Sequence, residues 1–464
     1  MRRAFAYIAV LLCAVAFSRD AGAASRYIAD LERSALPEVS APDVRVLDLS
    51  NGMRCYLLSD TALPIVKAEV ITRIGGIYDP ADKVGLAALA AAHMRTGGAG
   101  SLSPEEFDKR FDDLGASLDN SAGREMSVAV LNVLSEDLDE GMGLMFDMLF
   151  RPKFDEKRFA TARKNMEEAI LRSDDSPDEQ ASRIFREMIY GKKSPWARRP
   201  DKRSLGRIKA KDIADFHDRY FKANNMILAV AGDFSYGKMK VLLEKLATSA
   251  PSGDVVLPQV EPVELRFAEK REDVKKRTSQ SFIRMGHLGI RRDNPDRFAL
   301  TLLDDVLGGS GFKSRLMEDI RVKRGMAYSI YSSMTADKDY GTFVVSMDTK
   351  ANQAEKAIEL VREHIRRVAD DGDFTREEID FSKRSMLARL VFLFDQPFGV
   401  VNQRARYHFF GYPDDYWRVY RDGIMRADKK ELKRVAKEYL HPDGLGIVVV
   451  GPAGAAKGKG AKKR

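Results

Sequence analysis

The sequence is poor in cysteine, with only Cys13 and Cys55 among its 464 residues. Cys13 falls in an N-terminal segment that we expect to be removed, which leaves Cys55 as the single thiol of the mature chain. A single thiol excludes an internal disulfide, so packing of the core must stabilise the fold alone. Cys55 lies in the alternating stretch 53–57 with no histidine nearby in sequence. We therefore predict a buried core thiol and not a nucleophile.

The N-terminal apolar run, from Ala4 to Phe17, is too short to cross a membrane. A spanning helix needs roughly 20 apolar residues. Two arginines precede the run, and the small residues 21–23 follow it. This pattern is typical of a secretory signal peptide, here residues 1–23. We predict export, to the periplasm of a Gram-negative bacterium, with no integral membrane span after signal cleavage.

Long stretches of charge of one sign are absent from most of the chain. The formal net charge of +8 raises nucleic acid or a membrane surface as candidate partners. Acidic and basic residues are mixed along most helical stretches, however, as in residues 355–367. Such mixing indicates solvated helix faces, and we expect no nucleic-acid partner. Only residues 453–464 are basic and of low complexity, and we expect this tail to be disordered.

The length of 464 residues exceeds one ordinary hydrophobic core, so two or more domains are expected. Residues 251–264 contain three prolines and lack helical periodicity. A stretch of that kind is typical of an interdomain linker. We therefore predict an N-terminal domain over residues 24–250 and a C-terminal domain over residues 265–452.

The two predicted domains end alike, in segments 211–234 and 430–453. Each segment reads as an amphipathic helix, a turn and an apolar strand that stops at a glycine. Their shared residues recur at a constant spacing of 219 positions, with Lys211, Tyr220 and Gly232 matching Lys430, Tyr439 and Gly451. A unit repeated in register near both ends indicates an internal duplication.

Strand patterns and helix patterns occur in blocks. Residues 44–58 read as a hairpin around Asn51-Gly52, the strongest short hairpin signal. Further strands are expected over 66–73, 279–285 and 341–347, and helices over 154–172, 182–190, 354–368 and 376–394. This order favours the α+β class, with antiparallel sheets covered by helices, over a doubly wound parallel sheet.

Residues 85–94 read Gly-Leu-Ala-Ala-Leu-Ala-Ala-Ala-His-Met and resemble the zinc-binding helix of the pitrilysin/insulinase metallopeptidase family. In that family Gly-Leu-Ala precedes His-x-x-Glu-His, the inverted zincin motif. Positions i and i+4 share one helix face, so two histidines can bind one zinc while the glutamate reaches the attacking water. Here the three positions hold Ala88, Ala91 and Ala92, which offer neither a ligand nor a proton relay. The resemblance therefore implies a degenerate zinc site with no metal bound by this chain.

The family's third zinc ligand is a glutamate on a later helix, shortly before an Asp-x-Pro-like turn. Glu167 or Glu168 occupies that place here. A lone carboxylate is a weak zinc site, so we expect a solvated helix face instead. His93 stands one residue past the second ligand position, on another face of the helix, and we expect a partly buried or interfacial side chain. A peptidase active alone through these three residues remains an alternative that metal analysis can test.

The second half retains another family signature. Residues 307–316, Leu-Gly-Gly-Ser-Gly-Phe-Lys-Ser-Arg-Leu, lead into residues 320–329. In the family, an arginine and a tyrosine spaced like Arg321 and Tyr328 hydrogen-bond a carbonyl of a peptide held against the zinc half. A guanidinium and a phenol are suitable donors. Taken singly, Arg321 could instead form a salt bridge with Glu318 or Asp319, and Tyr328 could pack in a strand.

The glycine-rich segment, Gly308, Gly309, Ser310 and Gly311, lacks the Lys-Ser/Thr of a phosphate-binding loop. It also lacks the last glycine of the esterase motif Gly-x-Ser-x-Gly, because Phe312 takes that position. The segment is similar to the glycine-rich loop of the non-catalytic subunit of mitochondrial processing peptidase, although it is shorter. We therefore expect a flexible loop that contacts the substrate.

The resemblance spans about residues 40–452 and implies two domains that face each other as a clamshell. Short bacterial members often work in pairs, one protein with His-x-x-Glu-His and the other with the arginine and tyrosine. The resemblance thus implies a non-catalytic, substrate-binding subunit of a heterodimeric zinc metallopeptidase. A zinc-bearing paralogue is the expected partner, and a peptide the expected substrate. A stand-alone peptide-binding or scaffold protein of the envelope is the alternative.

Overall fold

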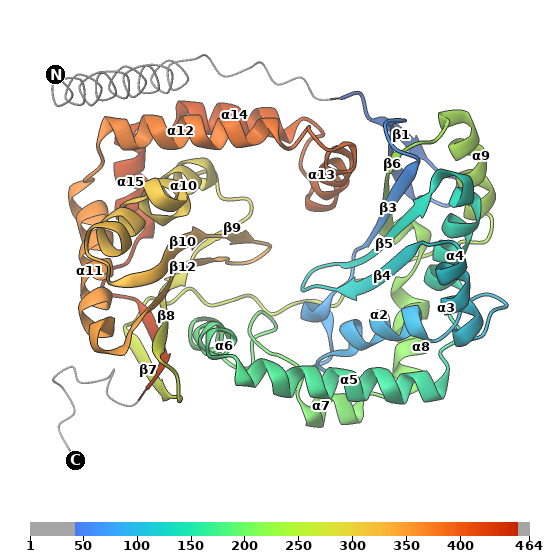
Figure 1. The fold of residues 1–464 in the computed structure, drawn as a ribbon, viewed down its shortest axis with the longest axis horizontal. Helices are drawn as coiled ribbons and strands as arrows, with labels where there is room; N and C mark the ends of the chain where they lie inside the picture. Colours follow the sequence, from blue (N-terminus) through green and yellow to red (C-terminus); the bar gives the residue numbers. More distant parts are fainter. Residues whose placement is uncertain (1–41, 453–464) are drawn as a thin grey trace, which may run out of the picture.

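The computed structural model describes residues 42–452. The predicted signal peptide and the basic tail lie outside the described residues. The elements form two halves, each with one main sheet and covering helices, which face each other across a central space (Figure 1). Residues 251–269, between the last helix of the first half and the first strand of the second, form neither helix nor strand. The predicted α+β class is confirmed.

The first half is built on a six-stranded sheet in the order β1-β2-β6-β3-β5-β4. Its strands are β1 (Arg45–Asp48), β2 (Arg54–Ser59), β3 (Ile65–Thr72), β4 (Ser117–Ala122), β5 (Ser127–Leu134) and β6 (Met226–Gly232). The predicted hairpin is present as β1 and β2, and Gly52 in its turn has a φ of 85°, which favours glycine. Cys55 of β2 is fully buried, as predicted, and burial raises the pKa of its thiol.

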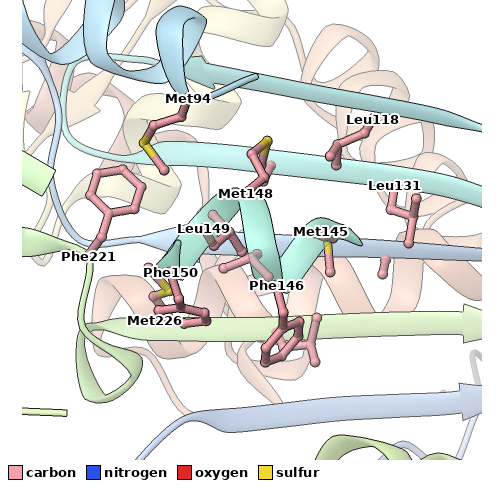
Figure 2. Packing of buried hydrophobic residues seen from close by; sticks show 14 of the residues in the cluster. Met94, Leu118, Leu131, Met145, Phe146, Met148, Leu149, Phe150, Phe221 and Met226 are labelled. Carbon is pink, nitrogen blue, oxygen red and sulfur yellow. The ribbon is translucent and has the colours of Figure 1, made fainter. Parts of the chain in front are cut away.

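The first half also contains helices, several of which pack against one face of this sheet. They are α2 (Leu86–Thr96), α3 (Pro104–Asp113), α4 (Leu138–Phe150), α5 (Glu156–Asp175), α6 (Pro177–Tyr190), α7 (Lys202–Arg207), α8 (Ala210–Tyr220) and α9 (Tyr236–Ala247). Figure 2 shows the core, where Met145, Phe146 and Leu149 of α4 gather against the strands together with Met94 of α2. No helix within residues 42–452 is long and apolar enough to cross a membrane.

The second half is built on a five-stranded sheet in the order β10-β12-β8-β13-β7. Its strands are β7 (Lys270–Lys275), β8 (Gln280–Leu288), β10 (Ala327–Met334), β12 (Thr342–Lys350) and β13 (Gly446–Gly451), while β9 (Ile290–Arg291) and β11 (Ala336–Asp337) form a separate pair. Its helices are α10 (Arg297–Asp304), α11 (Ala354–Arg366), α12 (Arg376–Val391), α13 (Pro397–Phe410), α14 (Tyr416–Arg426) and α15 (Lys429–Tyr439).

The repeat seen in the sequence is present in the structure. Helices α8 and α15 begin and end 219 positions apart, and each leads into the last strand of its half. These last strands, β6 and β13, lie inside their sheets and pair with one parallel and one antiparallel neighbour. The sheets are therefore antiparallel-rich and not purely antiparallel as predicted, because the final strand of each half inserts between strands formed earlier in the chain.

The two halves exchange one helix each. Helix α6 of the first half packs on β8 and β13 of the second, where Ile184 and Phe185 contact Val448 and Val450. Helix α13 of the second half packs on β2, β3 and β6 of the first, and Val401 lies in the same buried cluster as its strand residues. In Figure 1 each of these helices stands on the inner face of the opposite sheet. The halves are therefore joined by buried apolar surface.

Replacement of Gly232 by alanine is expected to destabilise the protein by about 3 kcal/mol or more. Gly232 has a φ of 134°, and a Cβ there would lie 2.1 Å from the carbonyl oxygen of Ile65 on the adjacent strand. Gly237 on α9 is the matched control, since a Cβ there meets nothing within 4 Å. Gly237→Ala should leave stability unchanged or raise it by about 0.5 kcal/mol. Urea unfolding midpoints measure both, and equal midpoints would contradict the expectation.

Candidate functional site

Helix α2 corresponds to the zinc-carrying helix of the resembling family, and hydrogen bonds stabilise its N-terminus. Asp79 accepts hydrogen bonds from the backbone N–H groups of Gly85 (2.7 Å) and Ala87 (2.9 Å), which satisfies donors in the first turn of α2. Burial raises the pKa of Asp79 to about 6, although these hydrogen bonds oppose the shift. Arg198 in turn donates to the carbonyl oxygen of Asp79. The N-terminus of α2 is thus fixed without any metal.

The three former ligand positions lie on α2 where it faces α5 and β4. Ala88 and Ala92 are half-buried, and Ala91 is fully buried. Asn120 of β4 donates its side-chain amide to the carbonyl oxygen of Ala91 at 3.0 Å. Methyl groups have no lone pair to give a metal ion, and residues 42–452 contain no group of three or more His, Cys, Asp or Glu side chains that could hold one. The donor set does not fit zinc.

The two candidates for the third ligand position, Glu167 and Glu168, differ in exposure and in their ion pairs. Glu168 is exposed and forms ion pairs with Lys164 (3.9 Å) and Arg172 (3.7 Å) on the same helix face. Glu167 is half-buried and has neither an ion pair nor a hydrogen bond with the described part of the chain. Helix α5 packs against α2 (Figure 1), and Glu167 is the less exposed of the two candidates. The solvated face that we expected for both residues is present for Glu168 alone.

His93 is fully buried, so the expectation of a partly buried or interfacial side chain is wrong. Its ring lies 5.7 Å from that of Phe154 and 5.6 Å from that of Phe159, measured between centroids. Within residues 42–452 neither ring nitrogen makes a hydrogen bond of normal geometry. Burial lowers the pKa of the ring below its usual value, and the nearby backbone of Phe154 opposes this shift. One position past the second ligand site, the helix turns the side chain into the core, and His93 is a neutral core residue.

Arg321 and Tyr328 lie next to each other in the second half. Arg321 is on the π-helical turn Met317–Lys323, and Tyr328 is near the start of β10. The guanidinium carbon of Arg321 stands 5.7 Å from the centroid of the Tyr328 ring and 4.9 Å from that of Phe312. The pair predicted from the sequence is thus brought together, with an additional aromatic ring beside it.

The acidic neighbours of Arg321 pair with other residues. Glu318 forms an ion pair with Lys323 at 3.0 Å, and Asp319 with Arg324 at 3.0 Å. The polar contact of Arg321 within the described chain is a weak one, with the sulfur of Met317 at 3.8 Å. The salt bridge considered as the structural alternative is therefore not formed, and the guanidinium keeps most of its donors.

The glycine-rich segment is packed more closely than the expected flexible loop. Gly308 is buried, and a Cβ there would lie 2.5 Å from the backbone nitrogen of Ser332 on β10. Gly309 and Gly311 are exposed, while the hydroxyl oxygen of Ser310 is buried without a partner. Gly308 therefore permits close approach to β10, and Gly309 and Gly311 face the solvent.

The strand at the outer edge of the first sheet, β4, was not predicted from the sequence. Strand β4 pairs with β5 on one side, and no strand of the described chain pairs with its other edge. Helix α2 lies beside that edge, where Arg95 donates to the carbonyl oxygen of Leu118 at 2.6 Å. The sequence of β4, Ser-Leu-Asp-Asn-Ser-Ala, is mostly polar and carries little strand signal. This edge therefore presents backbone groups that pair with no other strand of the described chain, apart from the carbonyl that Arg95 binds.

Two family models match the chain. The model described as insulinase (peptidase family M16) matches residues 55–194, and the model described as peptidase M16 inactive domain matches residues 207–386. Together they span most of the described residues, and the second match begins within the first half and ends within the second.

Bacterial relatives are similar to the chain over most of their length. The chain is 25% identical over 342 residues to an uncharacterized zinc protease, YmxG, of Bacillus subtilis, covering 74% of this chain and 82% of that one. It is 24% identical over 392 residues to the protein of Helicobacter pylori named non-peptidase homolog YmxG, covering 84% and 89%. A crystal structure of a peptidase M16 inactive domain from Pseudomonas fluorescens superposes with a TM-score of 0.80 and 25% identity, covering 89% and 98%.

Restoring histidines at the two ligand positions should create a metal site. We expect the purified Ala88→His/Ala92→His variant to bind roughly one zinc per chain, with Glu167 as third ligand. Adding Glu167→Gln should abolish zinc binding, and adding Glu168→Gln should preserve it. Metal analysis after gel filtration measures all three variants. Stoichiometric zinc in the unmodified chain would support the alternative of a peptidase that is active alone.

His93 should make the fold sensitive to mild acid. Because burial lowers its pKa from the ordinary value of 6.5, the unfolded chain takes up the proton more readily than the folded chain does. The stability contributed by neutral His93 is present above that value and is lost as the pH falls through the folded-state pKa. We expect His93→Leu to reduce the loss of stability between pH 7 and about 5, measured as the difference in unfolding free energy from the unmodified protein. An unchanged pH profile would contradict this assignment.

Proposed function

Because this chain belongs to the insulinase family of peptidases (family M16) and carries alanines where zinc ligands are needed, we propose that it is the non-catalytic, substrate-binding subunit of a heterodimeric zinc metallopeptidase. In this proposal Arg321 and Tyr328 bind a backbone carbonyl of the peptide. A zinc-bearing paralogue with His-x-x-Glu-His supplies the metal and the water-activating glutamate. This chain is thus an inactive-type homologue whose second half retains a binding role.

The observation that carries the proposal is the state of Arg321. Two acidic residues stand within three positions of it, yet both pair elsewhere, and its guanidinium remains beside the exposed ring of Tyr328. A guanidinium has five N–H donors, and a phenol has one. Two such groups side by side can hold one carbonyl oxygen and stabilise negative charge that develops on it.

Partner and location follow from the same proposal. The missing ligands require that zinc come from the paralogue, so neither chain alone contains both the metal and the carbonyl donors. The peptide is held between the chains, in extended form. The signal peptide predicted for this chain supports a location in the periplasm, and the proposal includes the same location for the paralogue. A scaffold of the envelope is the competing proposal. A scaffold would not need Arg321 and Tyr328.

Reconstitution tests the proposal directly. The mature chain and the paralogue with His-x-x-Glu-His, expected in an adjacent reading frame, are purified separately and together. We expect a stable complex by size-exclusion chromatography, and cleavage of unstructured peptides by the complex only. Full activity of the paralogue alone would overturn the proposed role.

Arg321→Ala should lower kcat/KM of the complex by about 100-fold or more, the usual effect of removing one donor to a developing oxyanion. Arg324→Ala is the matched control, because Arg324 is three residues away and is paired with Asp319. It should leave turnover close to that of the unmodified complex. Both variants should assemble normally, which size-exclusion chromatography checks. Equal activity of the two variants would favour the scaffold.

A further inference from the structure

Three exposed basic side chains lie at one end of the second sheet. Lys275 is the last residue of β7, Arg277 is in the connection from β7 to β8, and Lys350 is the last residue of β12. Within the described part of the chain, none of these three side chains has an ion pair or a hydrogen bond. Lys276 is half-buried instead, and it donates to the carbonyl oxygen of Asp174 at 2.6 Å. Three unpaired charges are therefore available to attract an anionic partner.

The register of the strands places these charges on one rim of the second half. Lys275 pairs with Gly451 of β13, and Lys350 pairs with Gln280 of β8. Strands β8 and β13 lie between β12 and β7, so three strand spacings, or about 14 Å, separate the two lysines. The connection that carries Arg277 crosses the end of β13 between them. We call these three residues the basic rim, and Figure 1 shows its strand β7 at the outer edge of the second half.

The basic tail begins beside this rim. Strand β13 ends at Gly451, whose carbonyl oxygen accepts a hydrogen bond from the backbone N–H of Lys276 at 2.7 Å. Residues 453–464 follow shortly after, and they contain five basic residues and no acidic one. The tail therefore starts next to the unpaired charges of the basic rim.

Three acidic side chains on the neighbouring segments are already paired. Asp273 of β7 and Glu355 of α11 both form ion pairs with Arg271, and Asp174 of α5 forms one with Arg199. Because arginines neutralise these carboxylates, they do not compensate the charges of the basic rim. A positive potential of this kind extends about 8 Å into a solution of physiological ionic strength.

We propose that the basic rim, Lys275, Arg277 and Lys350, together with residues 453–464, binds peripherally to an anionic phospholipid bilayer. Clusters of roughly four to eight basic residues are attracted to anionic headgroups, and each residue adds to the affinity. Three side chains from the rim and five from the tail make eight. The inference does not depend on the proposed function, because a peptidase subunit and a scaffold could both be held at a membrane.

Nucleic acid is the other polyanion that such charges attract, and two observations favour lipid. The connection 276–279 and residues 453–464 contain no aromatic residue on which a base could stack. The signal peptide expected over residues 1–23 directs a chain to the cell envelope, where membranes are the abundant anionic surface.

Co-sedimentation with lipid vesicles tests the proposal on the mature full-length chain. Vesicles of phosphatidylglycerol and phosphatidylcholine in equal parts are compared with vesicles of phosphatidylcholine alone. We expect binding to the anionic vesicles only, with a loss of affinity of about tenfold or more when the salt concentration rises from about 0.05 to 0.5 M. Equal binding to both kinds of vesicle, or no binding to the anionic vesicles at low salt, would overturn the proposal.

Removing charges from the rim and from the tail tests each part of the surface. The variant Lys275→Ala/Arg277→Ala/Lys350→Ala should bind the anionic vesicles about tenfold more weakly or worse, and so should a chain that stops at Pro452. Urea unfolding midpoints check that both variants remain folded. Unchanged binding of either variant would overturn the shared surface.

The matched control removes three exposed lysines from α9, which lies on the opposite side of the molecule from β7 (Figure 1). Lys238→Ala/Lys240→Ala/Lys245→Ala changes the net charge by the same amount and should bind vesicles like the unmodified chain. Equal weakening by this control would show that only the overall charge matters, and it would overturn the role of the rim. Tighter binding to a DNA duplex than to the anionic vesicles at the same ionic strength would overturn lipid as the partner.

Discussion

The reciprocal covering of the two sheets is the constraint on which the rest of the structure depends. Helix α6 seals a face of the second sheet, and α13 seals a face of the first. Glu69, buried on β3, forms an ion pair with Arg406 of α13 at 3.1 Å and adds a polar contact to this apolar junction. Neither sheet could bury both faces without the other half. The orientation of α2 relative to Arg321 is therefore set by core packing, and it does not require a bound metal or substrate.

Loss of the zinc ligands is compatible with an intact fold because α2 serves the core. Its buried side includes Leu89 and Met94, and its first turn is capped by Asp79. Alanine has the highest helix propensity, so Ala88, Ala91 and Ala92 favour the helix at the positions where zinc-binding members of the family carry histidine and glutamate. The second half shows the opposite balance, since exposed Phe312 and Tyr328 add nothing to the core. Exposed apolar side chains of this kind add no stability to the fold, so a role in binding explains their presence better than a role in stability.

Much of this architecture could be predicted from residues alone. The spacing of 219 positions located α8 and α15, and Asn51-Gly52 located the first hairpin, since both signals are local. Strand β4 was not predicted because its residues are mostly polar. The parallel pairing of β6 with β2 was not predicted because it depends on contacts between residues distant in sequence. The choice between Glu167 and Glu168 and the depth of His93 depend on how helices pack, which periodicity alone does not determine. Arg321 and Tyr328 were predicted through the family resemblance. Phe312 was considered only as the residue that replaces the last glycine of the esterase motif.

The exchange of helices also governs the order in which the protein can mature. Chain synthesis proceeds from the N-terminus, so the strands that carry Tyr56, Ile71 and Ile227 appear well before the helix that covers them, which ends at Phe410. Until then the first half exposes an apolar sheet face and also holds α6 without its sheet. The nascent protein thus passes through a stage with two open hydrophobic faces, and such faces are prone to aggregation until nearly the whole chain has emerged.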